Sequence, residues 1–156
     1  MTGRSELEHS ISRMMDSMVS PERRSSFGIV GIGIDVVTDE RMEEIGAPGF
    51  IQANFTEREI EYCTRPKSQR VQKERFAARW AAKEAVVKAL GGIGVWDFKE
   101  LEVIHTENGA PEVRLGENAR NKAQSLGVDS VLISFSHEND ISVALCIAAK
   151  NSGSGV

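Results

Sequence analysis

A long helix dominates the fold predicted for this 156-residue chain. It runs from about Ser68 to Leu90, and Gly91-Gly92 follows directly as the expected helix end. Alanines recur beside its apolar stripe at Ala77, Ala81 and Ala85, and their small side chains would let another backbone approach closely. We therefore expect this helix to be a central element with close neighbours.

Strands are predicted on both sides of this helix in the sequence. The segment 28–37 is apolar and β-branched, which is typical of a buried strand. Two hairpins follow the helix, the first with strands at Leu101–Thr106 and Glu112–Leu115, the second with strands at Val131–His137 and Ile141–Ala149. This order indicates an α+β fold, a single domain in which a largely antiparallel sheet packs on the long central helix.

Shorter helices are predicted from their capping residues. Thr38 can cap a helix that ends near Gly46. Thr56 and Glu59 fit a capping box, in which each side chain bonds to the backbone of the other residue. A further helix is expected at Glu117–Leu126, before a glycine that can end it.

The chain divides into three parts by composition. Residues 28–150 hold the predicted strands and the long helix, and they are expected to form the folded domain. Residues 1–27 are an N-terminal extension rich in serine and methionine, interpreted either as disordered or as a short helix. Residues 151–156 are a Gly/Ser-rich tail that is expected to be flexible.

Overall composition narrows the class of protein. The formal net charge of −4 gives no general attraction to nucleic acid, so no nucleic-acid partner is predicted. No stretch approaches the ~20 apolar residues of a membrane span, and no signal peptide is recognisable, so no membrane association is expected. Cys63 and Cys146 lack metal-type spacing and are interpreted as buried free thiols, which favours a reducing, cytoplasmic setting.

Glu84 is the most informative polar residue of the long helix. It lies beside the apolar stripe, four residues after Trp80 and four before Lys88. A carboxylate at the edge of a buried helix is expected to be paired, protonated or bound to a metal ion, because burying it alone is costly. The simplest alternative is an ion pair with Lys88, worth ~0.2–0.5 kcal/mol. The helix alone does not choose between these interpretations.

Asp35 and His137 also permit two interpretations when each is taken singly. Asp35 ends the first predicted strand, where it fits either a ligand group or the cap of the next helix. His137 follows Ser136 near a turn, and such a histidine is commonly solvated. Gly31 and Gly33 lack the third glycine of a dinucleotide fingerprint, so they indicate close packing instead.

Taken together, these segments resemble the holo-acyl-carrier-protein synthases, the short 4′-phosphopantetheinyl transferases. The resemblance covers about residues 28–150, and its motifs occur in the order typical of that family. They are Gly31-Ile32-Gly33-Ile34-Asp35 with Arg41 six residues later, Phe55-Thr56 with Glu59, Phe76-Ala77-Ala78-Arg79-Trp80-Ala81-Ala82-Lys83-Glu84-Ala85 with Lys88, Gly109-Ala110-Pro111, and Ser134 with Ser136-His137.

This resemblance implies a magnesium-dependent transfer of 4′-phosphopantetheine from coenzyme A to a serine of an apo acyl carrier protein. A carrier domain of a fatty acid synthase would serve equally, and both belong to lipid biosynthesis. The implied products are the holo carrier and adenosine 3′,5′-bisphosphate. The resemblance also implies a homotrimer that holds coenzyme A in the cleft between neighbouring subunits.

The resemblance gives each candidate site residue a role. Asp35 and Glu84 would hold the magnesium ion, which is commonly bound by one or two carboxylates and substrate phosphate. Lys88 would contact the phosphates, and Arg41 would face the acidic carrier protein. Glu84, directly or through a metal-bound water, is the candidate base for the carrier serine. Four further residues would bind the nucleotide end of coenzyme A: Arg79, Lys83, Ser136 and His137.

Two other functions would use much the same residues. One is a non-catalytic structural domain of a synthase, against which the complete set of polar site residues argues. The other is a magnesium-dependent hydrolase of nucleotide pyrophosphates, which would need the metal site but no surface for a carrier.

Overall fold

The computed structural model describes residues 28–92 and 96–150. The predicted N-terminal extension (1–27) and tail (151–156) lie outside these residues. In chain order the elements are β1 (Ile29–Thr38), α3 (Asp39–Ile45), α4 (Pro48–Asn54), α5 (Glu57–Thr64), α6 (Gln69–Ala89), the 3-10 turn η1 (Phe98–Glu100), β2 (Leu101–His105), β3 (Pro111–Leu115), α7 (Glu117–Ser125), β4 (Ser130–Glu138) and β5 (Ile141–Ala149).

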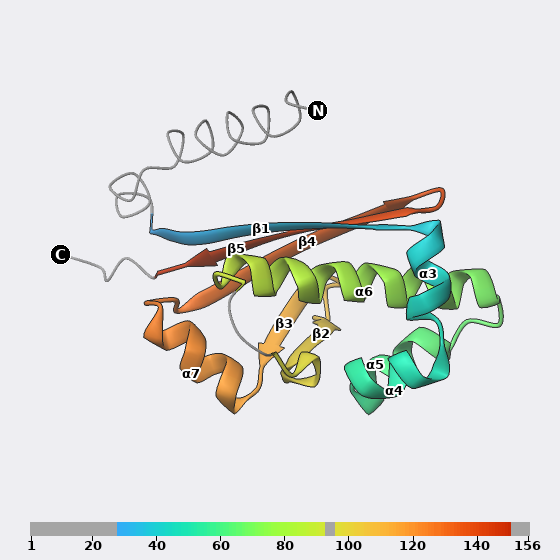
Figure 1. Cartoon of the computed structure of the whole chain (residues 1–156), viewed down its shortest axis with the longest axis horizontal. Coiled ribbons are helices and arrows are strands. Elements are labelled where there is room, and N and C mark those ends of the chain that lie inside the picture. Colours follow the sequence, from blue (N-terminus) through green and yellow to red (C-terminus); the bar gives the residue numbers. More distant parts are fainter. Residues whose placement is uncertain (1–27, 93–95, 151–156) are drawn as a thin grey trace, which may run out of the picture.

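The long helix α6 lies at the centre of the molecule (Figure 1). A three-stranded antiparallel sheet with the order β1-β5-β4 packs along one side of it. The two-stranded sheet β2-β3, together with α4 and α5, lies on the other side (Figure 1). The predicted α+β fold, with antiparallel strands packed on a central helix, is therefore confirmed.

Local signals set the ends of α6 and α5 as predicted. The Ser68 hydroxyl accepts a hydrogen bond from the backbone of Val71 and starts α6. The helix ends at Ala89 with Leu90 as its C-cap, and Gly91 follows with a φ of 91°, which favours glycine because it has no Cβ. Thr56 and Glu59 form the predicted capping box at the start of α5.

The small residues of β1 and α6 bring the two backbones into close contact. A Cβ atom added at Gly33 would lie 1.9 Å from the carbonyl oxygen of Ala85, and one added at Gly31 would lie 2.0 Å from that of Ala89. The interpretation of these glycines as packing residues is confirmed. Because only glycine fits there, β1 can hold Asp35 directly against α6.

The apolar sequence of β1 predicted a buried strand, but only one face of β1 is buried. Ile32, Ile34 and Val36 are 49%, 57% and 51% exposed. They share the outer face of the three-stranded sheet with exposed Leu132 and Leu145 of β4 and β5. This face turns away from α6, and none of the described elements covers it (Figure 1). We call this surface the outer sheet face.

Two short elements escaped prediction, α4 and η1. α4 begins at Pro48 and has no side-chain cap, so its sequence lacks the usual helix-start signal.

The predicted burial of both thiols is confirmed, and burial raises the pKa of Cys63 to about 11 and that of Cys146 to about 12. Among the residues described, no helix is long and apolar enough to cross a membrane.

Candidate active site

Asp35 lies where β1 passes over α6. Its side chain points inward from the sheet and is only 8% exposed. The Lys88 ammonium donates to Asp35 Oδ1 at 2.7 Å and to the Ile34 carbonyl at 3.0 Å. Asp35 Oδ2 is buried and has no hydrogen-bond partner among the described residues. A buried carboxylate oxygen without a donor is energetically costly, so this atom is well suited to accept a ligand.

Glu84 faces the same place from α6. Its side chain is 24% exposed, and the Arg41 guanidinium of α3 lies 3.2 Å from Glu84 Oε1. Burial, then the negative charge of Asp35, and then a hydrogen bond that a protonated Glu84 can donate to Asp35 raise the pKa of Glu84 to about 7, so Asp35 Oδ2 is without a donor when Glu84 is ionised. The two carboxylates therefore repel each other, and they have two basic neighbours. Asp35, Arg41, Glu84 and Lys88 together form what we call the carboxylate site.

The donor set of the carboxylate site fits a hard divalent cation such as Mg²⁺. Asp35 and Glu84 supply oxygen ligands, one of them the unpartnered Oδ2. No group of three or more His, Cys, Asp or Glu that could hold a metal ion occurs among the residues described. Two protein carboxylates suit Mg²⁺, which usually takes its remaining ligands from water and substrate phosphate.

Arg79 belongs to a different group of basic and aromatic side chains. Its guanidinium stacks 4.1 Å from the Tyr62 ring centroid, and that of Arg75 lies 4.5 Å from the same ring. Arg79 Nη2 is 3.3 Å from His105 Nδ1. Within the described ranges, no carboxylate forms an ion pair with either arginine. We call Tyr62, Arg75, Arg79 and His105 the arginine cluster. Arg79 is only 2% exposed, whereas Arg75 is partly exposed, so Arg75 is the guanidinium of this cluster that an anion can reach without a rearrangement.

Three members of the arginine cluster were missed by sequence reasoning. Arg75 precedes Arg79 by one helical turn, so the spacing could have placed both on one face of α6. Tyr62 and His105 come from α5 and β2, and no sequence signal joins them to α6. Burial, followed by the charges of Arg79 and Arg75, lowers the pKa of His105.

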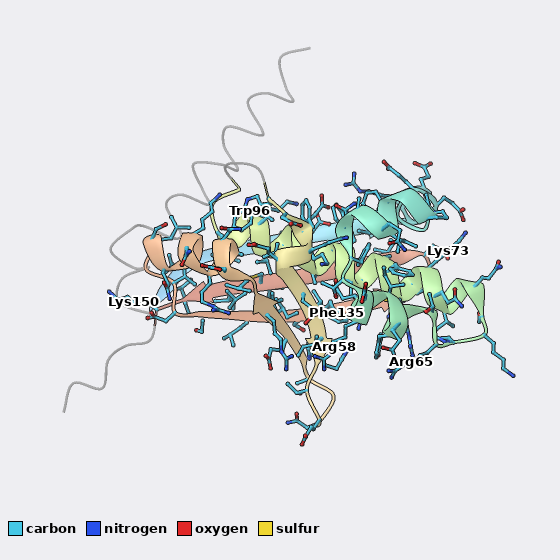
Figure 2. The ribbon with its side chains drawn as sticks, turned by 90° about the horizontal axis from the view of Figure 1, so that it is seen from below. Arg58, Arg65, Lys73, Trp96, Phe135 and Lys150 are labelled. Atoms are coloured by element: carbon cyan, nitrogen blue, oxygen red, sulfur yellow. The ribbon has the colours of Figure 1, made fainter. Side chains whose placement is uncertain are left out.

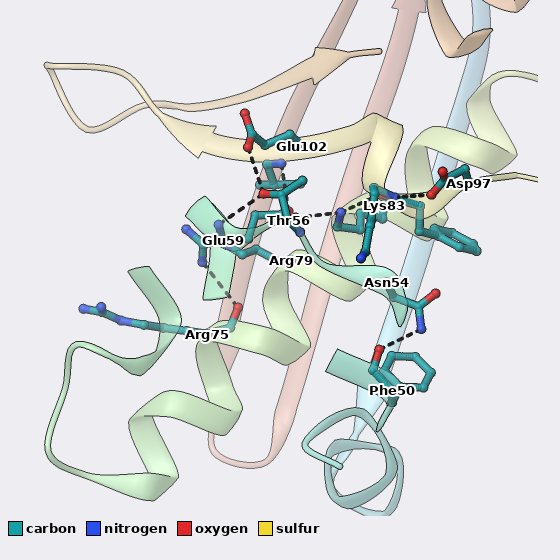
Figure 3. A network of polar contacts seen from close by, with 12 residues as sticks. Phe50, Asn54, Thr56, Glu59, Arg75, Arg79, Lys83, Asp97 and Glu102 are labelled. Carbon is teal, nitrogen blue, oxygen red and sulfur yellow. Dashed lines mark hydrogen bonds and ion pairs between the residues drawn. The ribbon is translucent and has the colours of Figure 1, made fainter. Parts of the chain in front are cut away.

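The predicted contact of Lys83 with coenzyme A is contradicted by its burial. The side chain is 0% exposed, and its ammonium donates to Glu59 Oε2 at 2.9 Å and to the Phe98 carbonyl at 2.6 Å. Glu59 also accepts hydrogen bonds from the backbone of Thr56 (Figure 3) and from that of Val103 in β2. Burial lowers the pKa of Lys83, and Glu59 opposes that effect. Lys83 thus joins α6 to α5 and η1, and through Glu59 to β2, away from the surface.

Ser136 and His137 point to opposite faces of β4, because side chains alternate along a strand. Ser136 pairs with Val143 and lies on the outer sheet face. His137 lies on the α6 side, with Nε2 4.0 Å from Glu74 Oε2. In one chain these neighbours therefore cannot contact the same group of a ligand. Their predicted binding of the nucleotide end stays a prediction.

The carboxylate site and the arginine cluster lie on different sides of α6. Arg79 and Glu84 are five positions apart, which corresponds to about 140° around a helix. A cavity of about 360 Å³ exists elsewhere, between β3, α7 and the start of β4, and is lined by residues such as Val113, Arg120 and Val131. None of the predicted site residues lines that cavity.

Comparison with known proteins gives consistent matches. The family model of the 4′-phosphopantetheinyl transferase superfamily matches residues 31–146. A holo-[acyl-carrier-protein] synthase of Caldicellulosiruptor saccharolyticus is 37% identical over 123 residues, which cover 78% of this chain and 98% of that protein. The fatty acid synthase subunit alpha of Saccharomyces cerevisiae is 36% identical over 143 residues, or 89% of this chain. The match spans only 7% of that subunit's length.

Solved structures of the same kind share the fold. A holo-[acyl-carrier-protein] synthase from Neisseria meningitidis has a TM-score of 0.69 at 28% identity, covering 78% of this chain and 99% of that one. A synthase from Bacillus anthracis, in complex with CoA (3′,5′-ADP), has a TM-score of 0.64 at 30% identity and covers 79% of this chain and 98% of its own.

Proposed function

The chain belongs to the 4′-phosphopantetheinyl transferase superfamily, within its holo-acyl-carrier-protein synthases, and on this premise we propose the reaction that it catalyses. It transfers 4′-phosphopantetheine from coenzyme A to a serine hydroxyl of an apo acyl carrier protein. The products are the holo carrier and adenosine 3′,5′-bisphosphate. The observation that carries this proposal is the carboxylate site, where a buried unpartnered Asp35 oxygen faces Glu84 beside Lys88.

The side chains of the carboxylate site divide the chemistry between them. Asp35 and Glu84 would hold Mg²⁺, which when bound neutralises charge on the coenzyme's pyrophosphate. Lys88 extends from the same place, with 52% of its side chain exposed, and would contact the phosphates. Its positive charge would stabilise the negative charge that develops on the departing nucleotide phosphate.

Glu84 is the proposed general base. The serine oxygen attacks the phosphorus that carries pantetheine, the bond from phosphorus to the nucleotide phosphate breaks, and the nucleotide leaves with that electron pair. The serine proton goes to Glu84. The Glu84 side chain is 24% exposed, so an incoming hydroxyl can reach its carboxylate, and a carboxylate within hydrogen-bond reach can accept that proton.

The positions of the two charged groups favour a site shared between subunits. One end of coenzyme A would contact Asp35, Glu84 and Lys88, while its nucleotide end would contact exposed His137 and the partly exposed Arg75, which lies beside the buried Arg79 of the arginine cluster. A neighbouring copy can present its arginine cluster to the carboxylate site of the first. The outer sheet face supplies an apolar surface for that association. We therefore include a homotrimer in the proposal.

Leu145→Glu is expected to dissociate the trimer without unfolding the subunit. Leu145 is 40% exposed in the single chain and lies on the central strand of the outer sheet face. A glutamate buried in an apolar interface is strongly unfavourable, so self-association should weaken by at least about tenfold. Light scattering measures the mass, and transferase activity should fall with it.

Leu126→Glu is the matched control, because Leu126 is 45% exposed and follows α7, outside the sheet. It should keep the mass and activity of the wild type. A Leu145→Glu protein that remains trimeric and active would show that the outer sheet face is not the interface.

Intact-mass measurement tests the reaction directly. An apo acyl carrier protein incubated with this chain, coenzyme A and Mg²⁺ should gain one phosphopantetheine, and a chelator should abolish the gain. Release of the nucleotide from coenzyme A without modification of a carrier would instead indicate a hydrolase. If neither carrier modification nor nucleotide release occurs, whether with free carriers or with a carrier domain of a fatty acid synthase, the result would point to a non-catalytic domain.

The carrier and the compartment are finer parts of the proposal. The similarity to the yeast synthase subunit supports testing a carrier domain of a fatty acid synthase beside free-standing carriers. The two buried free thiols support a cytoplasmic setting, in which cysteines stay reduced.

A further inference from the structure

Arg41 makes a contact that the proposed chemistry does not require. It is the only cation of α3, whose sequence is Asp39-Glu40-Arg41-Met42-Glu43-Glu44-Ile45. Its guanidinium Nη2 reaches α6 and lies 3.2 Å from Glu84 Oε1. Glu84 is one of the two carboxylates to which we assign the metal ion. The Arg41 guanidinium is therefore paired with a carboxylate that the metal ion would need as a ligand.

The two cations of the carboxylate site are held unequally. Lys88 has a second anchor in the Ile34 carbonyl, and Asp35 keeps Oδ2 free, so Asp35 can accept an ion without losing Lys88. Among the residues that the structure describes, Arg41 pairs with Glu84 alone, its side chain is 47% exposed, and an exposed ion pair contributes little. An ion bound to Glu84 would repel the guanidinium on the same carboxylate. Arg41 is thus the cation that metal binding displaces.

Release of Arg41 changes the charge that α3 presents. Glu40 and Glu44 of α3 are exposed, and Glu43 forms an ion pair with Lys73 of α6. While Arg41 pairs with Glu84 its charge is neutralised, although its side chain is 47% exposed, so the exposed carboxylates of α3 dominate and repel an acidic partner. A bound divalent ion adds positive charge beside α3 and frees its only arginine.

We propose that Arg41 is a latch between metal loading and carrier docking, paired with Glu84 in the metal-free protein and released to the carrier when a divalent ion binds Asp35 and Glu84. This inference rests on the proposed function, since it uses the same metal site and partner. Binding free energies are reciprocal, so a docked carrier must tighten metal binding by the same factor by which the metal tightens docking.

The metal half of the latch can be measured on the full chain without coenzyme A. Mn²⁺ accepts the oxygen ligands that suit Mg²⁺, and its free fraction can be followed by electron paramagnetic resonance. Arg41→Ala should bind Mn²⁺ about two- to fivefold more tightly than the wild type, the strength of one exposed ion pair. Arg65→Ala is the matched control, because Arg65 forms a single exposed ion pair with Glu61 at 3.0 Å. Its Mn²⁺ affinity should be that of the wild type.

The carrier half uses a fluorescently labelled apo acyl carrier protein, again without coenzyme A, so that no turnover occurs. Saturating Mn²⁺ should raise the affinity of the wild type about two- to fivefold, to match the metal effect. Glu84→Gln should bind the carrier with that higher affinity in the absence of any ion, because glutamine does not hold Arg41 by charge. Arg41→Ala should bind weakly and lose most of the dependence on Mn²⁺.

The outcomes separate the latch from the proposed function. If the wild type shows no Mn²⁺ binding that depends on Glu84, the metal site itself is absent and the latch is overturned with it. If the wild type binds Mn²⁺ through Glu84 but Arg41→Ala binds it no more tightly, the latch alone is overturned. A Glu84→Gln protein that binds the carrier as weakly as the metal-free wild type would likewise overturn the latch alone.

Discussion

Gly33→Ala is expected to prevent the chain from reaching its native fold. The new methyl carbon would lie 1.9 Å from the Ala85 carbonyl oxygen and 2.6 Å from the Ala89 backbone nitrogen. Both neighbours are backbone atoms of α6, so no side chain can move to relieve the clash. The loss should exceed the ~1–3 kcal/mol of ordinary overpacking and approach the ~5–15 kcal/mol of a whole domain. Circular dichroism and thermal melting measure it.

Gly49→Ala provides the matched control for this substitution. Gly49 lies in α4, and a Cβ added there meets nothing within 4 Å. Alanine favours a helix over glycine by ~0.5–1 kcal/mol, so the melting temperature should stay the same or rise slightly. A cooperative, native-like melt of Gly33→Ala would show that β1 can move away from α6, and that the close approach is not needed for folding.

Local sequence signals predicted most of the fold because they act over a few residues. The caps at Ser68 and Thr56 and the ends of α6 are such signals. The exposure of Ile34 was not predictable in the same way, since an apolar residue has the same sequence appearance in a core and in an interface. β1 was therefore expected to be buried within one chain, and four of its ten residues are exposed.

The candidate site was predictable only in part. Taken singly, Glu84 and Asp35 each permitted a purely structural interpretation, and it was the resemblance to a known family that joined them with Arg41 and Lys88 in the carboxylate site, whose members the structure brings together. Spacing gave no information on where Lys83 points, because its partner Glu59 is 24 residues away in sequence. The same holds for Tyr62 and His105, which join Arg79 through tertiary packing alone.

The clearest loss of activity is expected for Glu84→Gln. The amide keeps the size of the side chain, but it cannot accept the serine proton and it binds a divalent ion poorly. Loss of a general base typically lowers the rate ~10²–10⁴-fold. The rate of phosphopantetheine transfer, followed by intact mass at saturating coenzyme A and Mg²⁺, measures the effect. Glu61→Gln is the control, since Glu61 is an exposed carboxylate paired with Arg65 on α5. Near-normal transfer by Glu84→Gln would exclude Glu84 as base and as metal ligand.

The same substitution should stabilise the metal-free protein. The pKa of Glu84 rises from 4.5 to about 7 in the folded chain, so the folded state binds this proton more tightly than the unfolded state. Stability therefore falls as the pH rises from about 4.5 to 7, and above pH 7 the ionised Glu84 beside Asp35 destabilises the fold. Glutamine removes that charge. In the presence of a chelator Glu84→Gln should melt above the wild type at about pH 8, and the difference should shrink towards pH 5.

A carboxylate that lowers the stability of the fold is kept in a protein when its function requires it. Equal melting temperatures at both pH values would mean that Arg41 and Lys88 already compensate the charge, and that the site has no excess negative charge to attract a metal ion.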